Sequence, residues 1–419
     1  MPNQNSSRLR WFVLLATSLS AASTLHAQVR AIEPPQSAIL TSTARSSAID
    51  AGDYVYISGQ TGQRPNGDIP ADFASQAAQA LDNIKSIVTA AGLGLQNIVY
   101  AKVYLQDVHD YDRLNAVFAK YFPETPPARA VLGVARVPQS SIEIDAVAVR
   151  DLSGRQAIIP PNFKSNEPFS PGILTHDRLF VSAMQGRDPA TDAVPENPAA
   201  QTDLALDNLK AVCEAAGLKL ANMVFVNPFL TSKIPSRIMN EHYARRFEFG
   251  NTPARATIEV TSLPHNAQIE YTGVAVRDLG LRHSIRPKNM PPSPTASPCV
   301  FAGETLYCSA KSGFIPGPNS GVYAPTTAAQ LRQTMRNQLD NLEEASMDFT
   351  TVVSATVYLD NISDSEIFNK VYAQYFKAPL PAQSIVQQIP STDRSPDSEA
   401  RYPDLEQMSL IAIRRPATN

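Results

Sequence analysis

The chain has 419 residues, which is enough for about three domains of ordinary size. A hydrophobic fraction of 43% with 18% charged residues is typical of soluble globular proteins. The formal net charge of -3 leaves no basic excess, which argues against nucleic acids and anionic membrane surfaces as partners.

The N-terminus has the pattern of a secretory signal peptide over residues 1–27. Arg8 and Arg10 supply a positive region, an apolar stretch runs to about Leu19, and small residues lead to a cleavage site after Ala27. The alternative is a single membrane anchor, but the apolar run is well short of the about 20 residues that span a bilayer. No other segment of the sequence has that character. We therefore expect a periplasmic or secreted protein.

After the signal, the sequence contains three collinear repeats, at residues 28–154, 155–282 and 283–419. Proline-rich linkers separate them. The best-matched segments are strand-like stretches beginning at Tyr54, Arg178 and Thr305, and helical Leu-Asp-Asn motifs beginning at Leu81, Leu206 and Leu339. The pattern predicts three copies of one folding unit.

Hydrophobic periodicity predicts the elements within a unit. In chain order, those of the first repeat are a hairpin (49–57), a helix (73–91), a strand (98–105), a second helix (111–122) and two further strands (129–137 and 141–149). Gly92 ends the first helix. Each unit is therefore α+β, a mixed sheet with two helices on one face. We expect the last two strands to pair around a turn near Gln139.

The three cysteines have two different settings. Cys213 occupies an apolar helix position and is expected in the core. Cys299 and Cys308 flank a turn at Gly303-Glu304; if that turn has two central residues, they face each other as a non-hydrogen-bonded pair, which a disulfide can bridge. An oxidising compartment would allow the bond, whereas a one-residue bulge would abolish it.

These motifs resemble the RidA (YjgF) family of reactive-intermediate deaminases, which hydrolyse enamines and imines. The resemblance rests on Ser58-Gly59-Gln60, the Leu-Asp-Asn-Ile-Lys helix followed by Ala-Ala-Gly, Pro-Pro-Ala-Arg ending at Arg129, and the strand Ile142–Val149. It extends over the first two repeats and most of the third. It implies a chorismate-mutase-like fold and, because family members form homotrimers with clefts between subunits, an intramolecular pseudo-trimer made by a monomeric chain.

The resemblance assigns the chemistry to four residues, Arg129, Glu143, Arg255 and Glu270. A guanidinium stays charged and can hold a carboxylate through two parallel hydrogen bonds. The glutamate would position the attacking water and move a proton to the departing amine. Without the resemblance, a surface arginine after a proline turn is as acceptable as a ligand-binding one, and a solvated strand face is the favoured interpretation of the glutamates. Asp145, on the same strand face as Glu143, is expected at the surface.

The same resemblance assigns ligand binding to Ser58, Gly59, Asn115, Phe169, Ser182 and Asn240. The serines can donate hydrogen bonds where two backbones approach closely. The asparagines line the cleft or, alternatively, face solvent. Phe169 occupies the position expected for an aromatic residue and the first repeat has Arg45 there, so a tyrosine hydroxyl is missing from both. Ala183 and Met184 replace Gly-Gln in the second repeat and narrow the space beside a ligand.

The third repeat lacks the charged pair, because Gln383 and Gln407 occupy the two positions, and it has an insertion at 391–403. If the last two strands of a repeat form a hairpin, Arg129 and Glu143 are about six residues, or about 20 Å, apart along it. The pair must then come from neighbouring repeats, and only one of three clefts is complete. If it came from one repeat, two clefts would be complete.

The function expected from this resemblance is hydrolytic deamination of small enamine or imine acids, such as 2-iminopropanoate, to keto acids and ammonia, with no metal or cofactor. No metal-ligand spacing or phosphate loop is present. The alternative is a non-catalytic periplasmic protein that binds small carboxylates or acts as a scaffold, which Arg45, Ala183 and Met184 favour. Endoribonuclease activity is a weaker alternative, because no basic, aromatic-lined groove is indicated.

Overall fold

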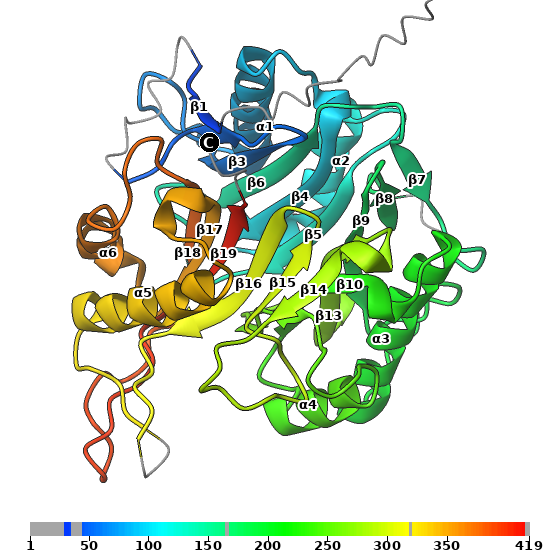
Figure 1. Cartoon of the computed structure of the whole chain (residues 1–419). Helices are drawn as coiled ribbons and strands as arrows, with labels where there is room; N and C mark the ends of the chain where they lie inside the picture. Colours follow the sequence, from blue (N-terminus) through cyan, green and yellow to red (C-terminus); the bar gives the residue numbers. More distant parts are fainter. Residues whose placement is uncertain (1–28, 35–43, 164–166, 318–320, 415–419) are drawn as a thin grey trace, which may run out of the picture.

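The computed structural model describes residues 29–34, 44–163, 167–317 and 321–414. The expected signal peptide, residues 1–27, lies outside this part of the chain. Three α+β units are arranged with their sheets toward the centre of the molecule and their helices outside (Figure 1). The predicted fold class is therefore confirmed. None of the helices in the described ranges is both long and apolar enough to cross a membrane.

Each unit repeats nearly the same order of elements. The first contains β1 (Arg30–Ile32), β2 (Ala48–Asp50), β3 (Tyr54–Thr61), α1 (Phe73–Ala90), β4 (Ile98–Leu105), α2 (Tyr111–Tyr121), β5 (Ala128–Gly133) and β6 (Ile142–Val149). The second contains β7 (Gln156–Ile158), β8 (Gly172–Leu174), β9 (Arg178–Gln185), α3 (Pro198–Ala215), β10 (Met223–Leu230), α4 (Ser236–Ala244), β11 (Ala254–Arg255), β12 (Ile258–Glu259) and β13 (Ile269–Val276). The third contains β14 (Arg282–Ile285), β15 (Cys299–Ala302), β16 (Thr305–Ser312), α5 (Thr327–Glu344), β17 (Val352–Leu359), α6 (Ser365–Tyr372), β18 (Ala382–Gln387) and β19 (Glu406–Ile413).

The strand order β1-β2-β3-β6-β4-β5 corrects the expected pairing of the last two strands. β5 pairs in parallel with β4, and β6 lies antiparallel between β3 and β4. The physical reason is α2, which follows β4 and returns the chain to the same end of the sheet, as a parallel connection requires. On β4, Arg129 lies opposite Ala101 and Glu143 opposite Tyr104, so the two are about 10 Å apart along the strands and not about 20 Å.

One helix-to-strand contact occurs in all three repeats and identifies their equivalent residues. Asn83 in α1, Asn208 in α3 and Asn337 in α5 each donate their side-chain amide to two backbone carbonyls at the end of the preceding long strand. The match of Leu339-Asp340-Asn341 to the earlier Leu-Asp-Asn motifs is therefore wrong by one helical turn. The third repeat has the same Leu-Asp-Asn sequence, but its Asn341 lies four residues after Asn337, the structural equivalent of Asn83.

The corrected register shows that the interior of the third repeat is unusually polar. Fully buried Thr334, Gln338, Asn341 and Glu406 occupy the positions that Ala80, Ile84, Ile87 and Ile142 have in the first repeat. Glu406 hydrogen-bonds the Thr334 hydroxyl, and burial raises the pKa of Glu406 to about 8. The helix–sheet contact of the third repeat is thus less apolar than those of the other two.

The three repeats pack as a closed ring. β5 packs against β9, β11 against β16, and β18 against β3, so each repeat contacts both others through equivalent strands. Apolar side chains from all three sheets meet in one cluster that includes Tyr56, Phe180 and Tyr307. This is the arrangement of a trimer contained in one chain.

One arginine occupies the centre of this ring. Arg178 stacks 4.2 Å from the centroid of the Tyr54 ring, donates to the Tyr307 hydroxyl at 2.8 Å and forms an ion pair with Asp177. The equivalent positions in the other repeats are Tyr54 and Thr305. The side chain therefore touches all three repeats while having no counterpart in two of them.

A second buried charge pair corrects the expectation that Asp145 is at the surface. Asp145 lies 3.6 Å from the Lys102 ammonium and accepts hydrogen bonds from Ser384 and Tyr104. The strand face that carries Asp145 is turned toward the other repeats and not toward solvent, because the ring of sheets covers it.

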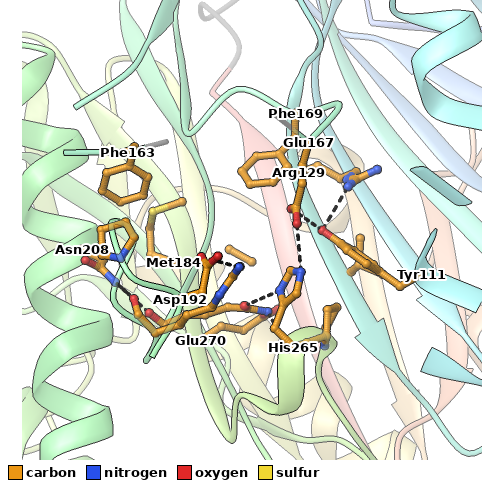
Figure 2. A pocket seen from close by; sticks show the side chains of 16 residues that line it. Tyr111, Arg129, Phe163, Glu167, Phe169, Met184, Asp192, Asn208, His265 and Glu270 are labelled. Carbon is orange, nitrogen blue, oxygen red and sulfur yellow. Dashed lines mark hydrogen bonds and ion pairs between the residues drawn. The ribbon is translucent and has the colours of Figure 1, made fainter. Parts of the chain in front are cut away.

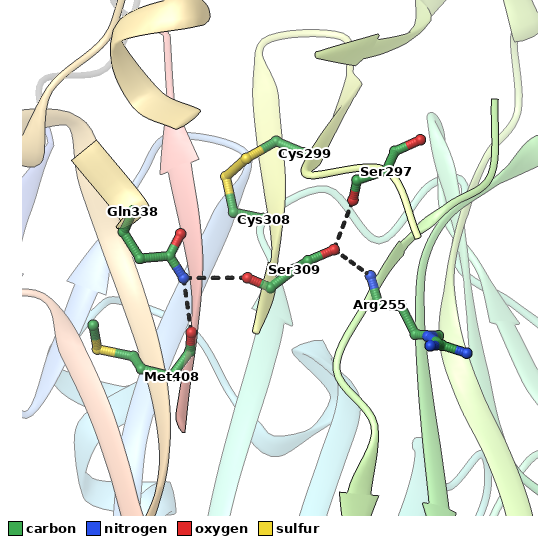
Figure 3. Close-up of a disulfide and its surroundings, with 7 residues drawn as sticks. All are labelled: Arg255, Ser297, Cys299, Cys308, Ser309, Gln338 and Met408. Carbon is green, nitrogen blue, oxygen red and sulfur yellow. Dashed lines mark hydrogen bonds between the residues drawn. A yellow bond between two sulfur atoms is a disulfide. The ribbon is translucent and has the colours of Figure 1, made fainter. Parts of the chain in front are cut away.

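The disulfide between Cys299 and Cys308 is confirmed (Figure 3). The two residues are register partners in the β15–β16 hairpin, with Cα atoms 4.0 Å apart, and Gly303 in the turn adopts a positive φ of 60°. No bulge separates them. Cys213 is buried and free, as predicted.

Candidate functional site

Each contact between repeats has the same backbone arrangement. We call them the first junction (β5 with β9), the second junction (β11 with β16) and the third junction (β18 with β3). The hydroxyls of Ser182, Ser309 and Ser58 accept the backbone N–H of Arg129, Arg255 and Gln383 at 2.7, 2.8 and 2.9 Å, respectively. Each hydroxyl donates its proton to a carbonyl of its own repeat at 2.6 Å.

This use of the hydroxyls bears on the predicted ligand-binding serines. Ser58 and Ser182 hold neighbouring repeats together, and their only protons are already donated to backbone carbonyls. Figure 3 shows the same bridge at the second junction, where Ser309 connects Ser297 to Arg255 beside the disulfide. A serine donation to a ligand would require one of these bonds to break.

The first junction contains a cleft of about 300 Å³ (Figure 2). Arg129 of the first repeat lines it, together with Glu270, Met184 and His265 of the second repeat. The structure therefore brings the arginine of one repeat and the glutamate of the next to a single cleft. Sequence reasoning also placed the pair across neighbouring repeats, but from a separation within one repeat about twice that given by the strand pairing.

Aromatic rings surround the Arg129 guanidinium. Its Cζ lies 4.7 Å from the Phe118 centroid, 5.5 Å from Tyr111 and 5.6 Å from Phe169. Nη2 donates to Asn115 Oδ1 at 2.6 Å, whereas Nη1 is buried without a partner. Burial lowers the pKa of Arg129, although Tyr111 and Glu167 oppose that shift.

No carboxylate of the described residues lies within ion-pair distance of Arg129. An almost fully buried cation without a counter-ion is costly, and an anionic ligand would remove that cost. The arrangement is therefore suited to a small carboxylate. Asn115 holds the guanidinium in place and is not one of the cleft-lining residues.

Sequence reasoning missed a chain of polar side chains that begins beside Arg129 and crosses to the second-repeat side of this cleft. The Tyr111 hydroxyl donates to Glu167 at 2.7 Å, Glu167 is 2.9 Å from His265 Nε2, and His265 Nδ1 is 3.0 Å from Gln185 Oε1. Burial raises the pKa of Glu167, but the bonds from His265 and Tyr111 outweigh it and hold that pKa below its usual value.

A signal for Tyr111 was present in the sequence. Tyr111 precedes Asn115 by four residues on α2, which places both on one helix face, and the other repeats have Ser236 and Ser365 there. It supplies a phenol hydroxyl that neither Arg45 nor Phe169 can. His265 lies in a tight 3-10 turn (Pro264–Asn266) with a positive φ of 60°, which periodicity does not reveal.

Glu270 is fully buried on β13. Its Oε2 accepts from Gln185 Nε2 at 3.2 Å, and its Oε1 has no partner in the described structure. Burial raises the pKa of Glu270 to about 8. Near neutral pH this carboxyl is therefore mostly protonated, and it becomes a base as the pH rises.

The residue after the junction serine controls where the glutamate can lie. A Cβ on Gly59 would come within 2.0 Å of Glu143 Oε1, so Glu143 folds over a space that only glycine leaves open. Ala183 has that Cβ, and Glu270 bonds Gln185 instead. Ala183 was predicted to narrow the space beside a ligand. In the structure its methyl group occupies the space over which Glu143 folds in the first repeat, and Glu270 lies elsewhere.

The second junction has the cation without the carboxylate. Arg255 donates to Asn240 Oδ1 at 2.8 Å and lies 5.1 Å from the Tyr243 centroid. Gln407 pairs with Ser312 in the position where Glu270 pairs with Gln185. Asn240 therefore holds its arginine as Asn115 does, but no glutamate faces it.

The third junction has the carboxylate without the cation, because Gln383 faces the wall that carries Glu143. Burial raises the pKa of Glu143 to about 7, and the charge of Arg45 opposes that shift. Only the first junction therefore combines an arginine at the Arg129 position with a glutamate at the Glu270 position; the arginine beside Glu143 is Arg45, which belongs to the same repeat as Glu143. Within the described ranges, no group of His, Cys, Asp and Glu is placed to hold a metal ion.

Comparison with known proteins finds one family three times along the chain. The family model described as endoribonuclease L-PSP matches residues 35–150, 161–277 and 289–389. The 2-iminobutanoate/2-iminopropanoate deaminase of Escherichia coli K12 is 45% identical over 107 residues, which are 24% of this chain and 84% of that protein. A RutC family protein of Pyrococcus horikoshii is 41% identical over 113 residues, 25% of this chain and 86% of its own length.

Among solved structures, the YjgF gene product from Escherichia coli is similar, at 40% identity over 26% of this chain and 96% of that chain, with a TM-score of 0.25. The family model matches three times in succession and accounts for most of the sequence. The chain therefore belongs to the RidA (YjgF) family, as three tandem copies in one polypeptide.

Proposed function

We propose that the first junction hydrolyses small enamine or imine acids, such as 2-iminopropanoate, to the keto acid and ammonia. The observation that carries this proposal is the buried Arg129, in one cleft with Glu270, with an unpartnered nitrogen and no carboxylate of the described residues at ion-pair distance. The name of the Escherichia coli relative, a 2-iminobutanoate/2-iminopropanoate deaminase, supports the same reaction.

In this proposal Arg129 binds the substrate carboxylate through its free Nη1. Ionised Glu270 accepts a proton from a water molecule as the water oxygen bonds to the C=N carbon. The proton then passes to the nitrogen, which gives a carbinolamine. Glu270 moves the remaining hydroxyl proton to the amine as the C–N bond breaks, and ammonia leaves as the carbonyl forms. One water molecule is consumed for each imine, and no redox partner is needed.

The test is ammonia release from enzymatically generated 2-iminopropanoate by the purified full chain. We expect release faster than spontaneous hydrolysis and loss of that excess in Arg129→Gln. Arg245→Gln is a matched control, because Arg245 is an exposed arginine that pairs with Glu241 on its own helix. An Arg129→Gln protein with normal release would refute the assigned role.

A second candidate is binding of small carboxylates without turnover. The protonated state of Glu270 near neutral pH and the Ala183 methyl favour it, since both limit the glutamate as a base. Calorimetry with pyruvate that shows binding, together with no ammonia release, would identify this function. We do not propose endoribonuclease activity, because a net charge of -3 offers no support for RNA binding.

We further propose that the protein acts in the periplasm or outside the cell as a monomeric pseudo-trimer. The Cys299–Cys308 disulfide supports an oxidising compartment. N-terminal sequencing of the protein from the producing cell would find a start near Gln28. A start at Met1, with the protein in the cytoplasm, would contradict this proposal.

A further inference from the structure

The third junction joins two walls with different chemistry. The first repeat contributes the Ser58-Gly59 step and Glu143, which is fully buried and accepts the Ile385 backbone N–H at 3.3 Å through Oε1. The third repeat contributes Gln383 in the position of the arginine. A glutamate able to direct water therefore faces a neutral amide.

Several buried polar atoms at this junction have no partner among the described residues. They are Glu143 Oε2, Asn369 Oδ1 and both amide atoms of Gln383. Buried polar groups in folded proteins are nearly always hydrogen-bonded, so such a group of orphans indicates that something else binds there.

The other junctions show why these atoms are free. Arg129 donates to Asn115 at 2.6 Å, and Arg255 donates to Asn240 at 2.8 Å. Asn369 occupies the same place on α6, but the side chain of Gln383 is shorter than an arginine and does not bond it. With glutamine in place of arginine, the Asn369 Oδ1 acceptor and both amide groups of Gln383 are left without a hydrogen-bond partner.

The unpartnered groups have the hydrogen-bonding pattern of a partner for a primary carboxamide. Gln383 Oε1 and Asn369 Oδ1 are acceptors, and Gln383 Nε2 is a donor. A primary carboxamide offers two N–H donors and one carbonyl acceptor, so it can satisfy all three. A carboxylate offers acceptors alone, and its oxygens would face the two acceptor oxygens of Gln383 and Asn369.

We propose that the third junction is a second, distinct site that takes 2-imino carboxamides, the neutral counterparts of the imino acids at the first junction. The chemistry rests on the proposed function. Water adds to the C=N carbon, and Glu143 carries first one water proton and then the proton of the new hydroxyl to the nitrogen. The C–N bond breaks, and ammonia leaves a 2-oxo carboxamide. The carboxamide group itself is held and not hydrolysed.

Arg45 completes this site without making it a carboxylate site. Its Nη1 donates to the Gln383 backbone carbonyl at 3.2 Å, and its charge acts on Glu143 from the same repeat. Because Arg45 and Glu143 balance each other, the junction is close to neutral when Glu143 is ionised. The first junction, in contrast, presents Arg129 to a mostly protonated glutamate.

The test uses pyruvamide and pyruvate, which are stable and need no turnover, with calorimetry on the full chain. We expect wild-type protein to bind one pyruvamide, and Gln383→Leu to bind it at least tenfold more weakly. Leucine retains most of the volume of glutamine without its polar groups. Gln383→Arg restores the residue type of the other repeats, and it is expected to lose pyruvamide and bind a second pyruvate.

Two results would overturn the proposal. One is pyruvamide binding of equal strength in wild type and Gln383→Leu. The other is no pyruvamide binding at millimolar concentration together with unchanged or higher stability of Gln383→Leu, which would mean that the junction holds only water. These binding measurements need no 2-iminopropanoate. If the deaminase assay at the first junction fails, they still show whether the third junction binds pyruvamide.

Hydrolysis at the third junction has its own readout. Ammonia release from 2-iminopropanamide should be lost in Glu143→Gln, while pyruvamide binding is retained. Loss of binding and release together would show that Glu143 maintains the junction and does not act on water.

Discussion

The first and third junctions have the same backbone connections but differ on both walls. The first has Arg129 facing a wall with Ala183 and Glu270, and the third has Gln383 facing a wall with Gly59 and Glu143. Every repeat supplies one wall to each of two junctions. A substitution in one repeat therefore changes single walls of different junctions, and covalent fusion lets the junctions become chemically different.

The strongest way to break this comparison is Arg129→Gln, which makes the first junction resemble the third. We expect kcat/KM for 2-iminopropanoate to fall about 100-fold, since a hydrogen bond to a charged group contributes about 1.5–3 kcal/mol. Ammonia release measures the change. An equal loss in Arg255→Gln would show that the second junction also turns over substrate. The claim that the first junction is the site of deamination would then be wrong.

The second test concerns the glutamate wall. Glu270→Gln should lower kcat about 100-fold with a small change in KM, as expected on removal of a general base. Because burial raises the pKa of Glu270 to about 8, the wild-type kcat/KM should rise with pH through that value as the carboxyl ionises. A wild-type profile that is flat from slightly acidic to alkaline pH would contradict the role of Glu270.

A third test asks whether the buried Glu406, between α5 and the sheet of the third repeat, destabilises the protein. Glu406→Ile introduces the residue type of Ile142 and Ile269. The pKa of Glu406 in the folded protein, about 8, lies above its ordinary value, so the unfolded state binds fewer protons and stability falls as pH rises toward 8.

The isoleucine does not titrate, so the variant should gain about 1–3 kcal/mol over wild type at alkaline pH and less at mildly acidic pH. Urea unfolding at both pH values measures the difference. A gain that is independent of pH would show that Glu406 does not titrate in this range. Asp404, whose pKa burial raises to about 7, repels ionised Glu406, and the variant removes this repulsion as well.

The smallest expected effect comes from Ala183→Gly, which gives the first junction the glycine of the third. The glutamate can then fold as Glu143 does, and the midpoint of the pH profile should fall below about 8 without reaching that of Glu143, because Phe169 stands in the place of Arg45. At neutral pH this would raise kcat/KM by less than about fivefold, through the larger ionised fraction. An unchanged midpoint would mean that the methyl does not control the position of Glu270.

Much of the fold could be predicted because its signals are local. Repeated strand and helix patterns identify three α+β units, and the two-residue turn at Gly303-Glu304 correctly pairs Cys299 with Cys308. The parallel pairing of β4 with β5 was missed because it depends on α2 acting as a crossover, which periodicity does not show. The helix register of the third repeat was missed because the Leu-Asp-Asn motif contains Asn341, whereas Asn337, one turn earlier, makes the equivalent contact.

The site could be predicted in part for the same reason. Arg129 and Glu270 belong to recognisable motifs, but their placement across a junction was inferred from a strand pairing that the structure does not have. Tyr111, Glu167 and His265 come from three separate segments and meet only when the ring closes. The buried position of Asp145 was also hidden, because its strand face reads as solvated until a neighbouring repeat covers it.

Arg178 shows what a fused ring can hold that a symmetric one cannot. In a homotrimer every residue near the axis occurs three times, so one arginine at this place would bring two more, and three guanidiniums would repel one another in a space with little water. Here the axis carries one cation between Tyr54, Tyr307 and Asp177. The three repeats are thereby no longer interchangeable, and a ring assembled from three copies of the second repeat alone would be expected to fail at its centre.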